Sequence, residues 1–232
     1  HGSTPLIPEG SPISAVVING NGKTFTATGD GVGPIRLANG GKLTLNNLTI
    51  VDESESYAEN SWEFGYLEMA GVLEINDCNV VNAIMFEGET AVFAGCTFNS
   101  NKDNEYAVWV SDGIATFNGC TFKKSWDKYG LWAYGNVDVT VQGSTFADYR
   151  GIKMYAENGA DASVEKANLT VKNTNFSAVD NKPAIVLTYG ESVVLEGNTY
   201  SSTGTFELDL DGKPNGVAVT SDVAPTCVND NG

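Results

Sequence analysis

The chain has 232 residues, 26 of them glycine, with a formal net charge of −16 and an isoelectric point near 4.2. This acidic balance argues against nucleic acid or an anionic membrane surface as a partner. The sequence holds no run of about 18 apolar residues, so we expect no insertion into a membrane.

The first 15 residues are predicted to be an irregular entry segment. They contain three prolines, and His1-Gly2-Ser3 looks like the remnant of a polyhistidine tag. Without His1 the chain contains no histidine, which removes the commonest general base and metal ligand. Residues 16–232 are predicted to form one domain, with a capping segment from about residue 201, where the sequence pattern described next decays.

A short pattern recurs through most of this domain. It consists of an apolar residue, two turn-forming residues, a small residue, Thr or Asn, and a large apolar or aromatic residue. The closing residue falls at positions 50, 80, 98, 122, 146, 176 and 200, at steps of 18 to 30 residues. Self-similarity at such a period indicates stacked structural repeats.

Local alternation shows what kind of repeat this is. Apolar and polar residues alternate around each copy, as in residues 139–141, and a period of two predicts strands. Another short strand precedes each copy, as at residues 107–110. One repeat is therefore three short strands separated by turns. Stacked repeats of this kind form an all-β solenoid, a parallel β-helix of about eight coils with three parallel sheets around one core.

Four cysteines raise the question of disulfides. Cys78, Cys96 and Cys120 occupy the same inward position in consecutive coils, and Cys227 lies near the C-terminus. Buried thiols that fill the core as small apolar groups are the favoured interpretation. Neighbouring strands lie about 4.8 Å apart, so a disulfide between adjacent coils is the alternative.

Unusual outward residues are predicted on the strand that follows the longest turn. Alternation points these side chains outward: Met85, Trp109, Trp132, Tyr134, Lys153, Tyr155 and Val186. Outward strand positions normally carry polar residues, so we call Trp109, Trp132, Tyr134 and Tyr155 the aromatic strip. Trp62 and Trp126 in adjoining turns extend it. Aromatic groups rimmed by carboxylates suit sugar rings, which offer an apolar face and hydroxyl edges. In the alternative, the rings stack on each other or lie under the turns and bind nothing.

The early coils carry a family resemblance. The run Asn19-Gly20-Asn21-Gly22-Lys23-Thr24, followed by Ile35-Arg36-Leu37 and Leu43-Thr44-Leu45, resembles the opening coils of right-handed parallel β-helix proteins of the pectin-lyase-like superfamily. The resemblance extends over about residues 16–200 and concerns the scaffold. It implies a right-handed helix, and it implies that glycans are bound or cleaved beside the strand after the longest turn.

The same resemblance implies an enzymatic alternative. Lyases of this superfamily remove a proton with a Lys or Arg base beside calcium, which here would be Lys153 or Arg150, with Asp127 and Asp148 as calcium ligands. The aspartate clusters and arginine motif of those lyases are not recognisable. The adjacent Asp pair and Gly-His-Gly motif of polygalacturonases are missing too. An ion pair of Asp148 with Arg150 or Lys153 is the simpler interpretation.

We therefore expect a secreted or cell-surface domain that binds a polysaccharide, a cell-surface glycan or another surface through the aromatic strip and acidic turns. This adhesin-like role is non-catalytic and needs no cofactor, although calcium in the turns is an alternative. A polysaccharide lyase acting at the same face is the second hypothesis, and a structural segment of a larger surface protein is the third. The sequence leaves the ligand and the oligomeric state open.

Overall fold

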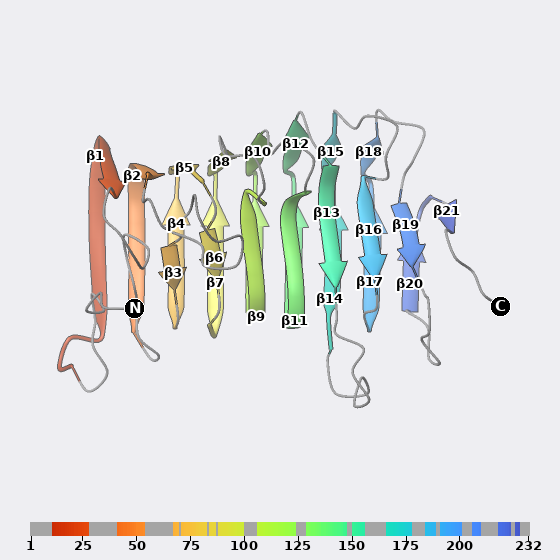
Figure 1. Ribbon diagram of the computed structural model, residues 1–232, viewed down its shortest axis with the longest axis horizontal. Helices are drawn as coiled ribbons and strands as arrows, with labels where there is room; N and C mark the ends of the chain where they lie inside the picture. Colours follow the sequence, from red (N-terminus) through yellow and green to blue (C-terminus); the bar gives the residue numbers. More distant parts are fainter. Residues whose placement is uncertain are drawn as a thin grey trace.

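The structure is all-β throughout the residues it describes. The computed structural model describes residues 11–27, 41–53, 67–69, 71–82, 84–86, 88–99, 106–123, 129–147, 150–155, 166–177, 184–188, 191–200, 206–209, 218–223 and 226–227. These contain 21 strands and no helix, and the strand pairings are parallel. The strands follow one another along the long axis from β1 to β21 (Figure 1).

The parallel pairings of the described strands can be followed along three columns. The first column contains β1 (Ala15–Ala27), β2 (Lys42–Asp52), β4 (Val72–Asn76), β7 (Thr90–Ala94), the second half of β9 (Val108–Asn118), the second half of β11 (Tyr129–Gln142), β14 (Asn168–Lys172), β17 (Ser192–Glu196) and β20 (Ala218–Ser221).

The second column begins with the second halves of β1 and β2. It continues through β5 (Asn79–Val81), β8 (Thr97–Asn99), β10 (Thr121–Lys123), β12 (Thr145–Ala147), β15 (Asn175–Phe176) and β18 (Thr199–Tyr200). The third column contains β3 (Leu67–Met69), β6 (Ile84–Phe86), the first halves of β9 and β11, β13 (Arg150–Tyr155), β16 (Ile185–Thr188), β19 (Phe206–Asp209) and β21 (Thr226–Cys227).

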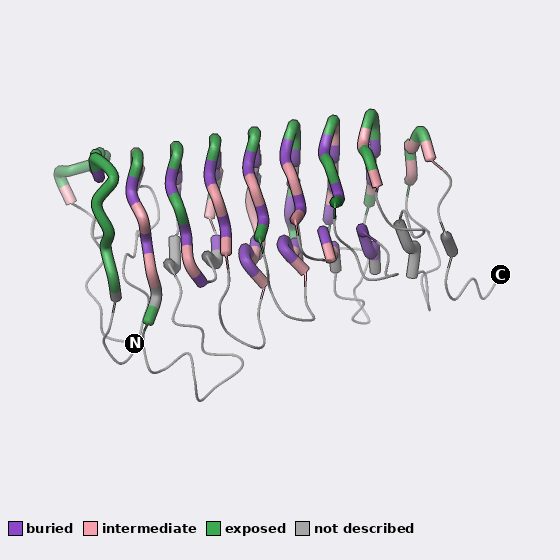
Figure 2. The backbone as a smooth tube through the Cα atoms, turned by 90° about the horizontal axis from the view of Figure 1, so that it is seen from above, coloured by how far each residue is buried: buried purple, intermediate pink, exposed green. Residues whose placement is uncertain are grey.

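Some strands turn a corner without ending. Strands β1 and β2 each run from the first column into the second, and β9 and β11 each run from the third into the first. The described strands are therefore joined by hydrogen bonds into one 21-stranded sheet that wraps around the core. Viewed from above, the coils between the two ends of the stack carry stretches of buried residues, which belong to the core (Figure 2).

The corner between the first and second columns explains the recurring sequence pattern. Two residues separate the strands there, and the first of them has a positive φ: Asp77, Gly95, Gly119, Gly143, Asn173 and Gly197, with Asn47 at the same place inside β2. A side chain with a Cβ crowds the backbone in this left-handed conformation, which glycine enters freely and Asn or Asp enters at low cost. The turn-forming residues of the pattern are therefore the corners of the coil.

The closing residues of the pattern form an aromatic ladder in the core. Phe98, Phe122, Phe146, Phe176 and Tyr200 stack in that order, with ring centroids 5.2, 4.2, 5.0 and 5.2 Å apart. The four phenylalanines are fully buried, and Ile50 and Val80 precede them in the same row. The closing residues of the repeat therefore form one continuous row in the core, as expected for stacked repeats.

The second corner residue points inward and forms a polar ladder beside the aromatic one. Cys78, Cys96, Cys120, Ser144 and Thr174 occupy this position and are buried. From Cys120 onward, each backbone N–H donates to the side chain one coil later, with Cys120 donating to Ser144 Oγ (3.1 Å), Ser144 to Thr174 Oγ1 (3.4 Å) and Thr174 to Asn198 Oδ1 (2.9 Å). The second corner position is thus occupied by small side chains, and several of them accept a hydrogen bond from the backbone of the preceding coil.

The three described thiols are free and buried, in agreement with the favoured interpretation. Their sulfur atoms donate to backbone carbonyls, for example Cys96 Sγ to Ile75 O at 3.2 Å. Burial raises the pKa of the Cys78 thiol to about 11, and the adjacent Cys120 side chain together with burial raises the pKa of Cys96. Since the thiolate is the reactive form, Cys78 and Cys96 are chemically quiet at neutral pH. The contact with Cys96 lowers the pKa of the Cys120 thiol, but burial keeps Cys120 away from reagents in solution.

We therefore expect Cys78, Cys96 and Cys120 to resist a thiol reagent in the folded protein at pH 8 and to react fully after denaturation without reductant. Titration with a chromogenic disulfide reagent, before and after guanidinium, measures both values. If two of the thiols stayed unreactive in the denatured protein, they would not be free, and a disulfide between adjacent coils would be the correct interpretation.

Candidate functional site

The third column carries the predicted site residues in the expected register. Trp109 pairs with Met85 on one side and Trp132 on the other, and Trp132 then pairs with Lys153. The burial alternates as predicted, because Val108, Val110, Leu131 and Ala133 are buried whereas Trp109 and Trp132 are half-buried. Neighbouring coils therefore place the two indoles side by side on the outer face.

A second row of side chains runs beside the first. Tyr106 and Tyr129 each lie three residues before a tryptophan, and Arg150 lies three residues before Lys153. Tyr129 pairs with Arg150 across β11 and β13. The two rows are thus Tyr106, Tyr129, Arg150 and Trp109, Trp132, Lys153, and each changes from aromatic to cationic at the same coil.

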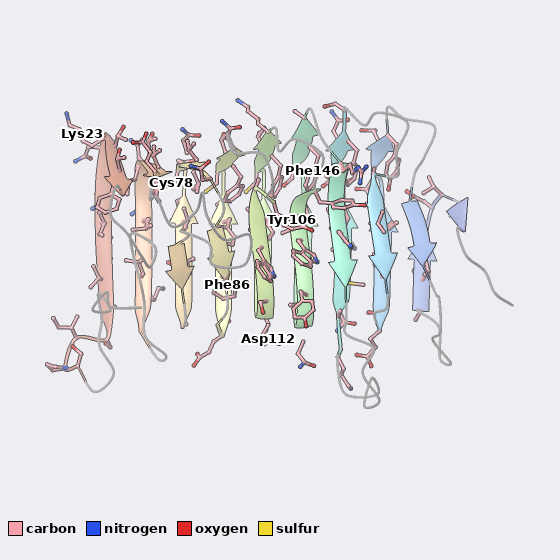
Figure 3. All side chains as sticks on the ribbon, viewed as in Figure 1. Lys23, Cys78, Phe86, Tyr106, Asp112 and Phe146 are labelled. Carbon is pink, nitrogen blue, oxygen red and sulfur yellow. The ribbon has the colours of Figure 1, made fainter. Side chains whose placement is uncertain are left out.

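The rings of these rows pack against one another. Trp109 and Trp132 stack with centroids 4.8 Å apart and planes 18° apart, and Tyr106 lies 4.3 Å from Trp132 at 37°. Tyr134 meets Trp132 edge-on at 6.2 Å, and Tyr106 stacks on Tyr129 at 6.5 Å. We call Tyr106, Trp109, Tyr129, Trp132 and Tyr134 the aromatic cluster; Figure 3 labels Tyr106 beside β9 and β11.

This packing decides which parts of the rings are available. Trp132 packs against both Trp109 and Tyr106, so neighbouring rings cover part of its indole. The half-buried state of Trp109, Trp132 and Tyr134 shows that the remaining ring surface still reaches solvent. The sequence left open whether these rings are exposed or are stacked on one another. In the structure they are stacked, and part of the aromatic cluster is still exposed.

The two cations adjoin the cluster. The guanidinium carbon of Arg150 lies 5.6 Å from the centroid of the Tyr129 ring, a cation–π contact. Lys153 is half-buried and in register with Trp132. In a chain with a net charge of −16, these two side chains place positive charge against the aromatic rings.

Glycines in the third column hold these strands close to the aromatic ladder. A Cβ at Gly130 would lie 2.9 Å from Cδ1 of Phe146, and a Cβ at Gly151 would overlap the Phe176 ring. Gly130 lies between Tyr129 and Leu131, and Gly151 lies between Arg150 and Ile152. The absence of side chains at these two positions therefore sets how close the site-bearing strands lie to the core.

Some of the predicted site residues are placed differently from expectation, and others lie outside the residues that the structure describes. Val186, predicted outward, is only 9 % exposed, so the exposed row ends before it. The backbone of Tyr155 pairs with Tyr134, but the Tyr155 side chain is outside the described parts. Trp62, Trp126, Asp127 and Asp148 also lie outside the described residues. The calcium hypothesis, which depends on the two aspartates, stays a prediction.

Sequence reasoning missed Tyr106, which is not part of the aromatic strip that it predicted. The signal was present, because Tyr106-Ala107-Val108-Trp109 and Tyr129-Gly130-Leu131-Trp132 share a Tyr-small-apolar-Trp pattern. Within the described ranges, no group of three or more His, Cys, Asp or Glu side chains could hold a metal ion. The described residues likewise include no helix long and apolar enough to cross a membrane.

Comparison with known proteins agrees with the architecture. A family model described as the right-handed β-helix region matches residues 66–231, which is more than half of the chain. No curated protein and no solved structure matches the chain. The three parallel columns, the inward aromatic ladder and this match agree, and the chain belongs to the right-handed β-helix family.

Proposed function

We propose that this domain binds carbohydrate, or another surface that presents similar chemistry, through the aromatic cluster, in a non-catalytic and adhesin-like role outside the cell. The observation that carries the proposal is the aromatic cluster itself: five aromatic rings from two successive coils gather at outward positions. Outward positions elsewhere on the coils are mostly polar, such as Thr97, Thr121 and Thr145 in the second column.

The ring geometry constrains how a sugar would bind. Because the indole faces of Trp109 and Trp132 contact each other, a sugar would lie across the ring edges and against Tyr134 instead of entering between the tryptophans. The apolar face of a pyranose suits such a surface, and its hydroxyl groups suit the neighbouring polar side chains. Lys153 and Arg150 lie close enough along the rows to meet polar groups of the same ligand.

The lyase hypothesis draws less support from the same residues. Its proposed base Arg150 directs its guanidinium over Tyr129, an arrangement that suits holding a ring or a ligand better than removing a proton. Lys153 has the right strand position for a base, but its proposed calcium partners lie outside the described residues. A purely structural segment would need no half-exposed rings at these positions, so the binding role is preferred.

The decisive experiment is a glycan array probed with the wild-type domain and with Trp109→Ala and Trp132→Ala. We expect Trp132→Ala to lower the affinity for a retained glycan at least about tenfold, equivalent to about 1.4 kcal/mol, because a central aromatic contact is lost. The matched control is Ile114→Ala, an apolar side chain that is 49 % exposed on the first column, away from the cluster.

Three outcomes would count against the proposal. If the array retained no glycan, the proposal that the ligand is a carbohydrate would be contradicted. If glycan binding survived the combined Trp109→Ala and Trp132→Ala substitution, the aromatic cluster would not be the binding site. New ultraviolet absorbance from unsaturated ends, after incubation with a uronate polymer and calcium, would establish the lyase instead.

A further inference from the structure

The N-terminal end of the stack leaves core rows uncovered. Val16 and Ile18 in β1 pair with Leu43 and Leu45, which are fully buried, yet both are only partly buried. Phe25 pairs with Ile50 in the row that continues into the aromatic ladder; Phe25 is 40 % exposed and Ile50 only 1 %. In Figure 2 the residues of the first coil are coloured mostly as exposed, whereas the following coils contain long buried stretches.

The backbone edge at this end is also open within the described chain. Strand β1 is 13 residues long and pairs with β2 alone among the described strands. A long strand edge beside exposed apolar side chains is a surface for pairing with another strand. Every described pairing in the molecule is parallel, so a coil added before β1 in the same manner would also run parallel to it.

The opposite end has matching features. Tyr200, Val219 and Val223 are partly buried residues that pack against the end of the core. Strand β20 pairs only with β17 in the described part of the chain. The two ends differ in charge, because residues 11–27 carry Lys23 and no acidic residue, whereas the turn after β20 carries Asp222. Figure 1 shows β1 and β21 at opposite ends of the long axis.

We propose that the C-terminal end of one copy docks on the N-terminal end of a second copy, with β20 of the first beside β1 of the next. This arrangement continues the parallel pairing and brings the two partly covered ends of the core together. It also joins the end that carries Lys23 to the end that carries Asp222. It is a heterologous contact that does not close on itself, so copies add in a row and the assembly lengthens with concentration.

The register of the contact follows from the first column. Ala15, Lys42, Val72, Thr90, Ile114, Asp138, Asn168, Ser192 and Ala218 are successive members of one row. Continued across the contact, the row places Ala218 of one copy beside Ala15 of the next, at the spacing of about 4.8 Å between paired strands. Both alanines are exposed, so either accepts a cysteine without a change in the core.

The first test measures molar mass against concentration by light scattering and sedimentation. We expect a mass that rises past the dimer, and an association constant about threefold lower for Lys23→Glu, because one exposed charge contact is reversed. Lys123→Glu is the matched control, since Lys123 is an exposed lysine of β10 in the middle of the stack. A constant monomer mass would overturn the proposal.

The second test uses cysteine pairs in a Cys227→Ser background. A mixture of Ala15→Cys and Ala218→Cys proteins, oxidised with copper phenanthroline, should form a crosslinked pair, since paired strands lie within the Cα range of a disulfide. Asp138→Cys replaces Ala15→Cys in the control mixture, because Asp138 is exposed in the same row but lies mid-stack. Crosslinking of Ala15→Cys with itself alone would show that two N-terminal ends meet, which overturns the head-to-tail arrangement.

Discussion

Replacing Phe146 by alanine should lower the free energy of unfolding by about 3–5 kcal/mol, the range for removing a buried phenylalanine side chain. Phe146 is fully buried near the middle of the aromatic ladder, stacked on Phe122 at 4.2 Å and on Phe176 at 5.0 Å. Its loss leaves a cavity and interrupts the row on both sides. Urea unfolding followed by far-ultraviolet circular dichroism measures the change, with the slope checked for constancy.

The matched control for this substitution is Phe25→Ala. Phe25 belongs to the same row but lies at the end of the stack and is 40 % exposed, so its removal should cost about 1 kcal/mol or less, in proportion to the smaller area removed from water. In a stacked-repeat protein each coil is stabilised by its neighbours on both sides. Equal costs at the two positions would contradict a continuous ladder as the main source of stability.

Replacing Gly151 by valine should destabilise the domain by about 1–3 kcal/mol, the usual cost of overpacking, because the added Cβ would overlap both the Phe176 ring and the backbone oxygen of Ala184. That oxygen accepts the hydrogen bond of the Ile152 N–H at 2.9 Å, so the strand cannot move away without loss. We expect β13 to shift, carrying Arg150 and Lys153 with it. Thermal unfolding and the near-ultraviolet dichroism of the tryptophans record both effects.

Gly119→Asn is the control for the Gly151 substitution. A Cβ at Gly119 meets nothing within 4 Å, and asparagine already occupies the same left-handed corner at Asn47 and Asn173. We expect almost no change in stability. A large loss at Gly119 would mean that glycine itself, rather than space beside the ladder, determines stability at these positions.

The rows of the fold could be predicted from the sequence because they follow from periodicity. The repeat placed Phe98, Phe122 and Phe146 at equivalent positions and Trp109 beside Trp132, as the ring stacking and the strand pairing show. Periodicity gives the direction of a side chain but not what covers it. Val186 therefore has the predicted position in the row, yet it is buried where exposure was expected.

The details of the aromatic cluster depend on features that repeat poorly. Tyr106 follows an insertion of variable length, so counting from the previous coil did not place it. The tilt between Tyr106 and Trp132 depends on rotamers and on the packing of neighbours, which no spacing rule fixes. Trp126 and Asp127 lie in insertions without any recurring pattern, and their part in the site remains a prediction.

The corner between the first and second columns has a consequence for how the surface can vary. Two residues separate the strands there in coil after coil, from Asp77-Cys78 to Gly197-Asn198, whereas the spacing between copies ranges from 18 to 30 residues. All differences in coil length are therefore taken up elsewhere on the circumference, including the segments that lead to the third column. Insertions can thus accumulate next to the aromatic cluster while the interior rows keep their register, so recognition can diverge without loss of the scaffold.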